Sequence, residues 1–401
     1  MRLRQGQRPH RVGSHGGDRR PDAPGRPDMV RNSRAGIENM WNPDHPVLKI
    51  LRQRRDSGST PGNRRDSAKV ALTVAGGGMR GAISAAMCTQ LDDSGFRDAF
   101  DVVYGCSAGA INAAYFLAQP AGTCWYPLSI YYQDLTADQF IRYTRPLSGG
   151  SILDLDYVFE EVLESKKPLK YDSTVRSPLD LVVLTTDLAA RETFAARDFA
   201  TGAELKEFLR ASARPPLVVK GESNIDGRRL VDGALLAPRQ FRPAIADGCT
   251  HILSLGTRRM GSSRERVPLG VRAYARYLER MREGLGSAYL AAHRRRARDR
   301  EVLSGQRFAT GGPGPHVLGI GPLPWMTPVR THETDPSRIL GSIRDAYSVS
   351  YCATEGIGID RLQGGLVSAL TRFAIAGHGG PERPTRPEEP TSDTGMAVST
   401  P

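Results

Sequence analysis

From residue 69 onward, short apolar runs alternate with stretches that favour helix. The apolar runs are rich in β-branched and aromatic residues, which predicts buried strands. These runs are residues 69–75, 100–104, 179–186, the pair 217–219 with 229–231, and 251–255. Stretches rich in helix formers lie between them, at residues 82–91, 108–117, 201–211 and 239–247. This alternation predicts an α/β fold, in which a mostly parallel sheet lies between two helical layers in a three-layer α/β/α arrangement.

Longer helical periodicity follows residue 270. In residues 271–300, apolar side chains recur every three or four positions, as on one face of a helix. Gly284 and Gly286 interrupt this segment, which predicts a kink or two shorter helices. Residues 337–376 contain two more stretches of similar periodicity. We expect both stretches to pack on the sheet.

A serine stands at the junction of one predicted strand and the helix after it. Ser107 is preceded by Gly105 and Cys106 and followed by Ala108 and Gly109, which gives the pattern G-x-S-x-G. Small residues in this pattern let strand and helix approach closely at a strained turn, which pushes the serine Oγ out at the edge of the sheet. The pattern therefore predicts a nucleophile elbow.

A glycine-rich loop connects the first predicted strand to its helix. The loop consists of Gly76, Gly77, Gly78, Met79, Arg80 and Gly81. Glycines in this place present free backbone N–H groups at a helix N-terminus, which favours a negative charge. The same letters fit the dinucleotide-binding fingerprint, but that site needs an acid at the end of the second strand. Asp101 stands at the start of that strand instead, which argues against nucleotide binding.

Asp232 follows a third short apolar run and precedes Gly233 and Ala234. Taken alone, an Asp-Gly pair after a strand is typical of a turn. However, the glycine loop, Ser107 and Asp232 each come directly after a predicted strand. Active sites of parallel sheets lie at the carboxyl ends of the strands, so we expect the three motifs to meet there.

In this order, the three motifs resemble those of the patatin-like phospholipase family, which carries D/G-G-G-G-x-R/K-G, G-x-S-x-G and D-G-G/A. The resemblance implies the patatin fold and a serine acyl hydrolase that cleaves carboxylic ester bonds of phospholipids or other acyl-ester lipids. It implies that Ser107 is the nucleophile and that Asp232 is its base, without a histidine. It also implies that the amides of Gly77, Gly78 and Met79 hold the oxyanion. Neither a cofactor nor a metal ion is implied.

Several positions around these motifs bear on the comparison with the family. Arg80 is the family's usual basic residue in the loop, and it would organise the loop or contact the phosphate of a lipid head group. Ala75 stands where many members carry Asp or Gly, and Ala234 replaces a second glycine. Residues 211–216 resemble the family's A-S-x-x-x-P element, in which Arg214 is unusual. Arg214 would either lie over the pocket or point to water.

An α/β-hydrolase with a Ser-Asp-His triad is an alternative, because such triads follow the same chain order. Four histidines come after Asp232, namely His251, His293, His316 and His332. The lipase-type loop that forms the oxyanion hole in those enzymes generally begins with histidine and lies farther upstream. The glycine loop of this chain has neither property.

Charge and composition suggest three parts. Residues 1–67 are rich in Arg, Pro and Gly and carry a net charge of +8 of the total +12, so we expect a disordered tail. Residues 68–376 form the expected catalytic domain, with a helical C-terminal part at 271–376. Residues 377–401 have the composition of a second disordered tail. Residues 272–300 add a net charge of +6, so the rest of the chain is close to neutral.

The arginine clusters leave open a nucleic-acid-binding protein on a degenerate hydrolase scaffold. The basic residues are not interleaved with aromatic residues, and 48 of 55 positive residues are arginine, which base composition alone can produce. We therefore expect an acyl-ester lipid substrate, peripheral contact with an anionic membrane surface, and no nucleic-acid partner. Residues 271–300 would supply the charge for that contact.

The first 30 residues are basic but contain no apolar segment of the kind found in signal peptides, and no run approaches the length of a bilayer span. The five cysteines form no C-x-x-C or Cys/His cluster, which argues against a metal site or a disulfide framework. We expect a cytoplasmic enzyme, peripheral to the inner face of the membrane. Met29 and Met40 are alternative start positions to Met1.

Overall fold

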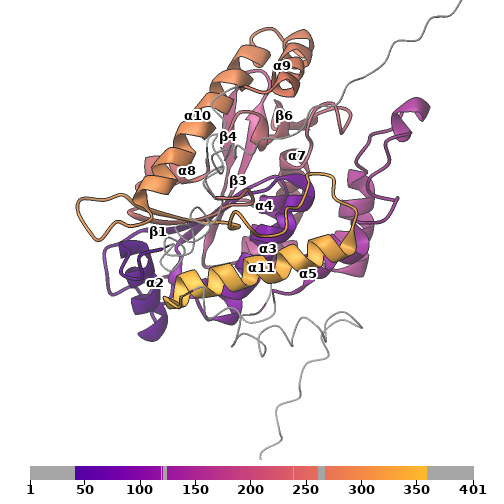
Figure 1. Cartoon of the computed structure of the whole chain (residues 1–401). Coiled ribbons are helices and arrows are strands. Elements are labelled where there is room, and N and C mark those ends of the chain that lie inside the picture. Colours follow the sequence, from indigo (N-terminus) through magenta and orange to yellow (C-terminus); the bar gives the residue numbers. More distant parts are fainter. Residues whose placement is uncertain (1–40, 119, 121–123, 238, 261–266, 359–401) are drawn as a thin grey trace, which may run out of the picture. The chain divides into compact units, whose positions relative to one another are not determined.

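A computed structural model of the chain describes most of residues 41–358. The described ranges are 41–118, 120, 124–237, 239–260 and 267–358. All of them belong to one unit of the chain, Asn39–Pro401 (Figure 1). The expectations for residues 1–40, for the second helical stretch of 337–376 and for the C-terminal tail lie outside the described residues.

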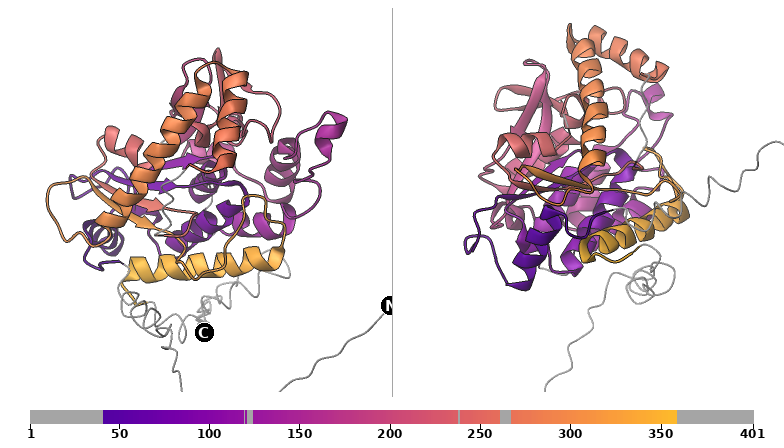
Figure 2. Two further views of the ribbon diagram at one scale, coloured as in Figure 1. Left: turned by 45° about the horizontal axis from the view of Figure 1, so that its top comes forward. Right: turned by 60° about the vertical axis from the view of Figure 1, so that its left-hand side comes forward.

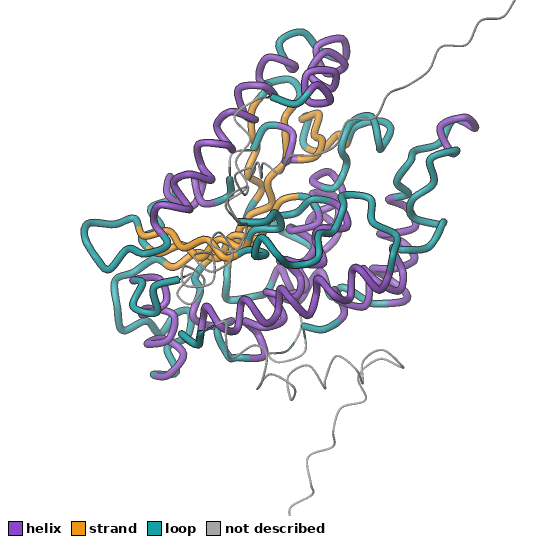
Figure 3. Tube along the Cα trace, in the orientation of Figure 1, coloured by secondary structure: helices purple, strands orange, loops and turns teal. Residues whose placement is uncertain are grey.

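Within these ranges, eight strands form one sheet in the order β5-β6-β3-β2-β1-β7-β8, and β4 also pairs with β3 (Figure 3). The strands are β1 (Val70–Val74), β2 (Val102–Cys106), β3 (Asp180–Asp187), β4 (Glu192–Ala196), β5 (Ser223–Ile225), β6 (Arg228–Asp232), β7 (His251–Leu255) and β8 (His316–Ile320). The five neighbours β3-β2-β1-β7-β8 run parallel, whereas β4, β5 and β6 pair in antiparallel fashion. The mostly parallel sheet is confirmed.

The parallel strands are buried on both faces, which explains their continuous apolar runs. Successive side chains of a strand point to opposite faces. In β1, Leu72 and Val74 join one hydrophobic cluster, whereas Ala71 joins another with Val102 and Tyr104 of β2. Each face of the sheet therefore has its own core.

Helices cover both faces of the sheet (Figures 1 and 2). The first cluster contains side chains of α2 (Pro46–Asp56), α3 (Gly81–Asp93), α4 (Ala108–Ala118), α7 (Gly202–Ser212) and α11 (Pro336–Glu355). The second contains side chains of α8 (Phe241–Ala246) and α10 (Leu285–Gln306). The three-layer α/β/α architecture is thus confirmed.

The remaining helical segments are short, apart from α9 (Leu269–Met281), which lies against α10. The short ones include α5 (Tyr126–Ser129), α6 (Tyr171–Val175), four 3-10 turns, and two π-helical segments, Ile130–Asp134 and Tyr157–Lys166. The interruption predicted within residues 271–300 is confirmed, because Gly284 adopts φ 78° between α9 and α10. Of the helices in the described residues, none is long and apolar enough to cross a membrane.

The expectation of disorder is wrong for residues 41–67. Helix α2 buries Val47, Leu48 and Leu51 against the sheet layer. Its Arg54 is buried as well, where Nη2 lies 2.7 Å from Asp66 and Nη1 lies 2.9 Å from Asp101. The composition of this segment, which is rich in arginine, predicted disorder. Instead, the ion pair between Arg54 and Asp101 connects the segment to the residue before β2.

The predicted β-pair is wrong in its first strand. Residues 217–219 form a turn, and β6 pairs instead with residues 223–225 across a tight turn at Asp226 and Gly227. Strands β4 and β8 were not predicted. Both lie beside a strand that the pattern did predict, and their own five-residue sequences contain charged, small or polar positions that weaken the strand signal.

Candidate active site

Ser107 stands in a sharp turn between β2 and α4. Its φ is 56°, which lies in the left-handed region that residues other than glycine rarely adopt. A Cβ on Gly105 would lie 2.4 Å from Ala110 Cα, and a Cβ on Gly109 would lie 2.3 Å from the Val74 carbonyl oxygen. The two glycines are therefore required by close approach of helix and strand, as the elbow pattern predicts.

Strand β3 brings Ser107 and Asp232 together. Cys106 is paired with Leu184 on β3, and Asp232 is paired with Thr185, the next residue of the same strand. As a result, the Ser107 hydroxyl donates a hydrogen bond of 2.9 Å to Asp232 Oδ2. A Cβ on Gly233 would lie 2.1 Å from the Leu184 carbonyl oxygen, so glycine after Asp232 is required by this packing.

The Asp232 carboxylate is buried, with 5% of the residue exposed. Burial disfavours the charged form and raises the pKa of Asp232 to about 6. Two hydrogen bonds oppose this effect, because Oδ1 accepts from the Ala234 N–H at 2.7 Å and Oδ2 accepts from Ser107. The positive charge of Arg296 also lowers the pKa. The result is a carboxylate that is ionised at neutral pH and more basic than one in water.

Ser212 stabilises the serine turn through hydrogen bonds. The Ser107 N–H donates to Ser212 Oγ at 2.8 Å, and the Ser212 hydroxyl donates to the Leu184 carbonyl oxygen at 2.7 Å. The sequence placed residues 211–216 near the site but assigned no role to Ser212. The unusual Arg214 is half-buried, directs Nη1 to the Lys220 carbonyl oxygen at 2.8 Å, and is not among the residues that line the larger cavity described below.

The glycine loop follows β1 and lies beside the serine turn. Gly77 and Gly78 have φ of 135° and 61°, and their amides have no acceptor among the described residues. The Met79 amide, in contrast, donates to the Thr331 carbonyl oxygen at 2.9 Å. Met79 was expected to be an oxyanion donor, and its amide is already occupied in this structure. Sequence could not reveal this, because residue 331 lies about 250 positions away.

The other positions of the loop fix its shape. The Thr257 hydroxyl donates to the Gly76 carbonyl oxygen at 2.7 Å. A Cβ on Gly81 would lie 2.2 Å from Tyr131 Oη, so α3 can begin there only with glycine. The Arg80 side chain folds back over the loop, since a Cβ on Gly77 would lie 2.9 Å from Arg80 Nε.

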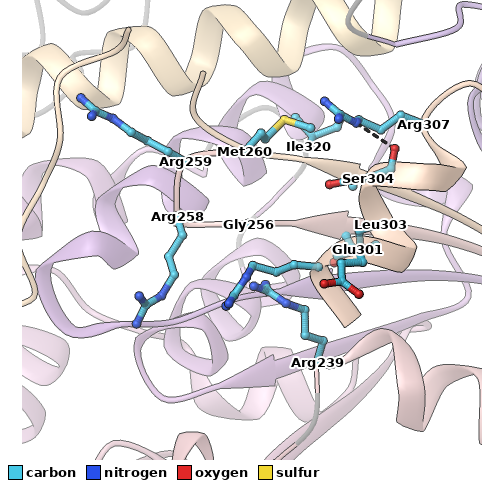
Figure 4. Close-up of a pocket in the computed structure, with 14 residues that line it drawn as sticks. Arg239, Gly256, Arg258, Arg259, Met260, Glu301, Leu303, Ser304, Arg307 and Ile320 are labelled. Atoms are coloured by element: carbon cyan, nitrogen blue, oxygen red, sulfur yellow. Dashed lines mark hydrogen bonds between the residues drawn. The ribbon is translucent and has the colours of Figure 1, made fainter. Parts of the chain in front are cut away.

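A cavity of about 550 Å³ opens beside these motifs. It is lined by Gly76 and Gly77 of the loop, by Cys106 before the serine, and by Ala234 after the aspartate. A smaller cavity of about 330 Å³ shares three arginines with it (Figure 4). The larger cavity therefore reaches the residue before Ser107 and the second residue after Asp232.

The four histidines of the alternative triad lie in different places. His251 and His316 pack against each other with tilted rings at the first residues of β7 and β8, the opposite end of the strands from Ser107. His332 Nδ1 lies 2.9 Å from the Tyr143 hydroxyl. Only His293 lines the larger cavity. Over the described ranges, no imidazole makes a hydrogen bond to Ser107 or Asp232.

Comparison with known proteins identifies the region that holds these motifs. The family model of patatin-like phospholipase matches residues 72–245, which include the glycine loop, Ser107 and Asp232. Among solved structures, the chain is similar to VipD from Legionella pneumophila, at 13% sequence identity over 73% of this chain and 68% of that chain, with a TM-score of 0.35. No curated protein matches the chain.

Proposed function

We propose that this chain cleaves carboxylic ester bonds of phospholipids through Ser107 and Asp232. The proposal is supported by the match of residues 72–245 to the family model of patatin-like phospholipase, which implies a lipid acyl hydrolase. The hydrogen bond of 2.9 Å between the Ser107 hydroxyl and the buried Asp232 carboxylate carries the proposal. A serine hydroxyl is a weak nucleophile, and a base within hydrogen-bond distance activates it. The pKa of about 6 keeps Asp232 ionised at neutral pH, so it can accept the proton.

The reaction proceeds in two halves. Ser107 Oγ attacks the ester carbonyl carbon while its proton moves to Asp232, and the tetrahedral intermediate collapses as Asp232 returns the proton to the leaving alcohol. This leaves an acyl group on Ser107. In the second half, water attacks the acyl carbon, its proton moves to Asp232 and then to Ser107 Oγ, and the carboxylic acid is released.

The free amides of Gly77 and Gly78 are the candidate oxyanion donors. Preorganised N–H groups aimed at the developing negative charge stabilise the transition state of acyl transfer. Met79 could join them only if its amide left the Thr331 carbonyl oxygen. Two donors are sufficient for an oxyanion hole of the kind that backbone amides form in other serine hydrolases.

The proposal is tested by labelling with a fluorophosphonate, which reacts with activated serines. We expect a single adduct on the peptide that contains Ser107, and none in Ser107→Ala. Ser165→Ala is the matched control, because Ser165 is exposed and makes no contact with the serine turn. An adduct that persists in Ser107→Ala would reject the nucleophile.

The triad alternative makes a different prediction for His293, the one histidine of the four that lines the larger cavity. A Ser-Asp dyad needs no imidazole, so His293→Ala should retain most ester hydrolysis. Loss of a triad histidine typically costs several orders of magnitude. A loss of that size in folded His293→Ala would replace the dyad with a triad.

We also propose peripheral contact with an anionic membrane surface. Arg294, Arg295 and Arg298 of α10 are exposed, and basic residues near a charged bilayer each contribute about 1 kcal/mol to binding. The loops that carry Leu147 and Leu217 are joined, because the Ile152 N–H donates to the Val218 carbonyl oxygen. Leu147 is 90% exposed and Leu217 is 61% exposed, which suits contact with lipid.

A further inference from the structure

Five arginines line the larger cavity beside the serine. They come from the glycine loop, from the segment before α8, from the end of β7 and from α10, and they are Arg80, Arg239, Arg258, Arg296 and Arg300. Among the residues that the structure describes, no aspartate or glutamate lines this cavity. Four separate segments of the fold thus direct positive charge into one cavity that also contains Gly76 and Gly77.

Three of these guanidinium groups have no partner among the described residues. Within the described ranges, the side chains of Arg80, Arg239 and Arg300 form neither an ion pair nor a hydrogen bond, and the Nε of each is buried. Burial lowers the pKa of Arg80 to about 10, and the charge of Arg258 adds to the effect. Burial and neighbouring arginines, Arg300 first among them, also lower the pKa of Arg239 to about 10.

Two described carboxylates on α10, Asp299 and Glu301, lie next to Arg300 in the chain. Asp299 is buried, pairs with Arg242 at 2.8 Å and accepts from the Arg239 backbone N–H. It offsets only part of the positive charge at Arg239. Glu301 lines the smaller cavity, is exposed and forms no ion pair with an arginine of the described residues.

The remaining two arginines shape the cavity. Arg296 Nη1 donates to the carbonyl oxygens of Ala234 and Ala237, each at 3.0 Å, which fixes the chain directly after Asp232. Figure 4 shows that Arg258 and Arg259, although adjacent in the chain, point in opposite directions from the end of β7. Arg258 alone of the two lines the larger cavity.

Like charges that are buried together without counter-ions are unfavourable, and an anionic ligand removes the cost. Guanidinium groups match phosphate oxygens through paired N–H donors. A phosphodiester offers one negative charge and therefore offsets less of the charge of three arginines than a phosphomonoester does. A phosphomonoester carries about −1.5 to −2 at pH 7. The cavity volume of about 550 Å³ accommodates such a group with its glycerol.

Resting on the proposed function, we infer that this cavity binds the head group of a phospholipid with at least two negative charges, as a phosphomonoester has. The head group would sit among the arginines while the acyl ester lies between Ser107 and the glycine loop. The arginines are then specificity residues of the hydrolase. They discriminate doubly charged from zwitterionic and singly charged lipids.

The test compares three lipids with identical acyl chains in uncharged detergent micelles: phosphatidic acid, phosphatidylglycerol and phosphatidylcholine. We expect kcat/KM to be at least tenfold higher for phosphatidic acid than for phosphatidylcholine. Arg239→Gln and Arg300→Gln should each reduce this ratio about tenfold. Arg344→Gln removes an exposed arginine of α11, which does not line the cavity, and should leave the ratio unchanged. Equal rates on the three lipids, or equal ratios in all variants, would overturn the inference.

Two further arms separate the possible outcomes. Hydrolysis of p-nitrophenyl butyrate, which has no head group, reports the serine chemistry alone, so its loss in Ser107→Ala tests the proposed function independently. Binding of inactive Ser107→Ala to micelles with phosphatidic acid tests the head-group site even without turnover. Inorganic phosphate at millimolar concentration should compete with this binding. A protein that binds phosphate but shows no preference among the lipids would have a site for free phosphate, and the head-group inference would be wrong.

Discussion

The Ser107 hydroxyl and Asp232 Oδ2 are 125 residues apart in the chain and 2.9 Å apart in space. Their contact depends on β3, which pairs in parallel with the strand before Ser107 and in antiparallel fashion with the strand that ends at Asp232. Because adjacent residues of β3 hold the two partners, a shift of one residue in either pairing would separate them. The sheet register is therefore part of the active site.

In the proposed mechanism, the pKa of Asp232 sets the pH dependence of hydrolysis. Burial raises this pKa to about 6, and only the ionised carboxylate can accept the serine proton. Activity on a short-chain ester should therefore fall tenfold per pH unit below about pH 6 and be constant above it. A pH–rate profile of kcat/KM measures this limb. An acid limb near pH 4 would mean that Asp232 behaves as an ordinary exposed carboxylate.

Asp232→Asn should abolish hydrolysis and stabilise the fold at neutral pH. The folded pKa of about 6 lies above the usual value of 3.8, so the folded protein holds this proton more tightly than the unfolded chain. The contribution of the Asp232 carboxyl to the free energy of unfolding is fully present below about pH 4. It declines as pH rises from about 4 to 6 and is lost above that range. The shift corresponds to about 3 kcal/mol.

Thermal unfolding at two pH values measures this effect. Asp232→Asn should unfold at a higher temperature than the wild type at pH 8, and the difference should shrink at pH 4. The amide can still accept from the Ala234 N–H and donate to Ser107, so the local hydrogen bonds can be kept. A variant that is less stable than the wild type at pH 8 would contradict a desolvated carboxylate.

Gly78→Ala should damage catalysis more than folding. Gly78 has φ 61°, and a Cβ there would lie 2.5 Å from the Thr331 carbonyl oxygen, the acceptor of the Met79 amide. The loop would have to move, which displaces the candidate donors, and loss of one oxyanion donor typically costs 10²–10³ in kcat. Gly62→Ala is the matched control, because Gly62 has φ 78° and open space around it. Equal activity of the two variants would exclude the loop from catalysis.

The sequence predicted the parts of the fold that repeat a simple rule. Buried parallel strands appear in the sequence as continuous apolar runs. The serine turn was predicted to need small residues where strand and helix approach closely, and the structure confirms this at Gly109. The same close approach occurs at Gly233, after Asp232. Contacts between distant segments were not predictable. The Met79–Thr331 bond and the arginine cavity depend on backbone positions that no local pattern encodes.

Charge runs were the least informative signal, because the structure gives neighbouring arginines different environments. On α10, Arg296 and Arg300 are four residues apart and line the cavity, whereas Arg295 and Arg298 are exposed. The sequence treated them as one basic surface. In the same way, the arginine-rich segment before β1 contains Arg54, which is buried between two carboxylates.

The last prediction follows from this division of α10. Simultaneous change of the exposed Arg294, Arg295 and Arg298 to Gln should weaken binding to vesicles that contain phosphatidylglycerol. Three charges at about 1 kcal/mol each imply roughly a hundredfold loss at low ionic strength, less at physiological salt. The loss should vanish on phosphatidylcholine vesicles, where no surface charge attracts the helix.

Co-sedimentation at two salt concentrations measures this binding. The control is Arg296→Gln with Arg300→Gln, which removes charge from the same helix but from its cavity side. If α10 faces the membrane through its exposed arginines, the triple variant loses more affinity per charge than this control. If both sets change vesicle binding equally per charge, the effect comes from net charge alone and α10 is not a membrane-contacting surface.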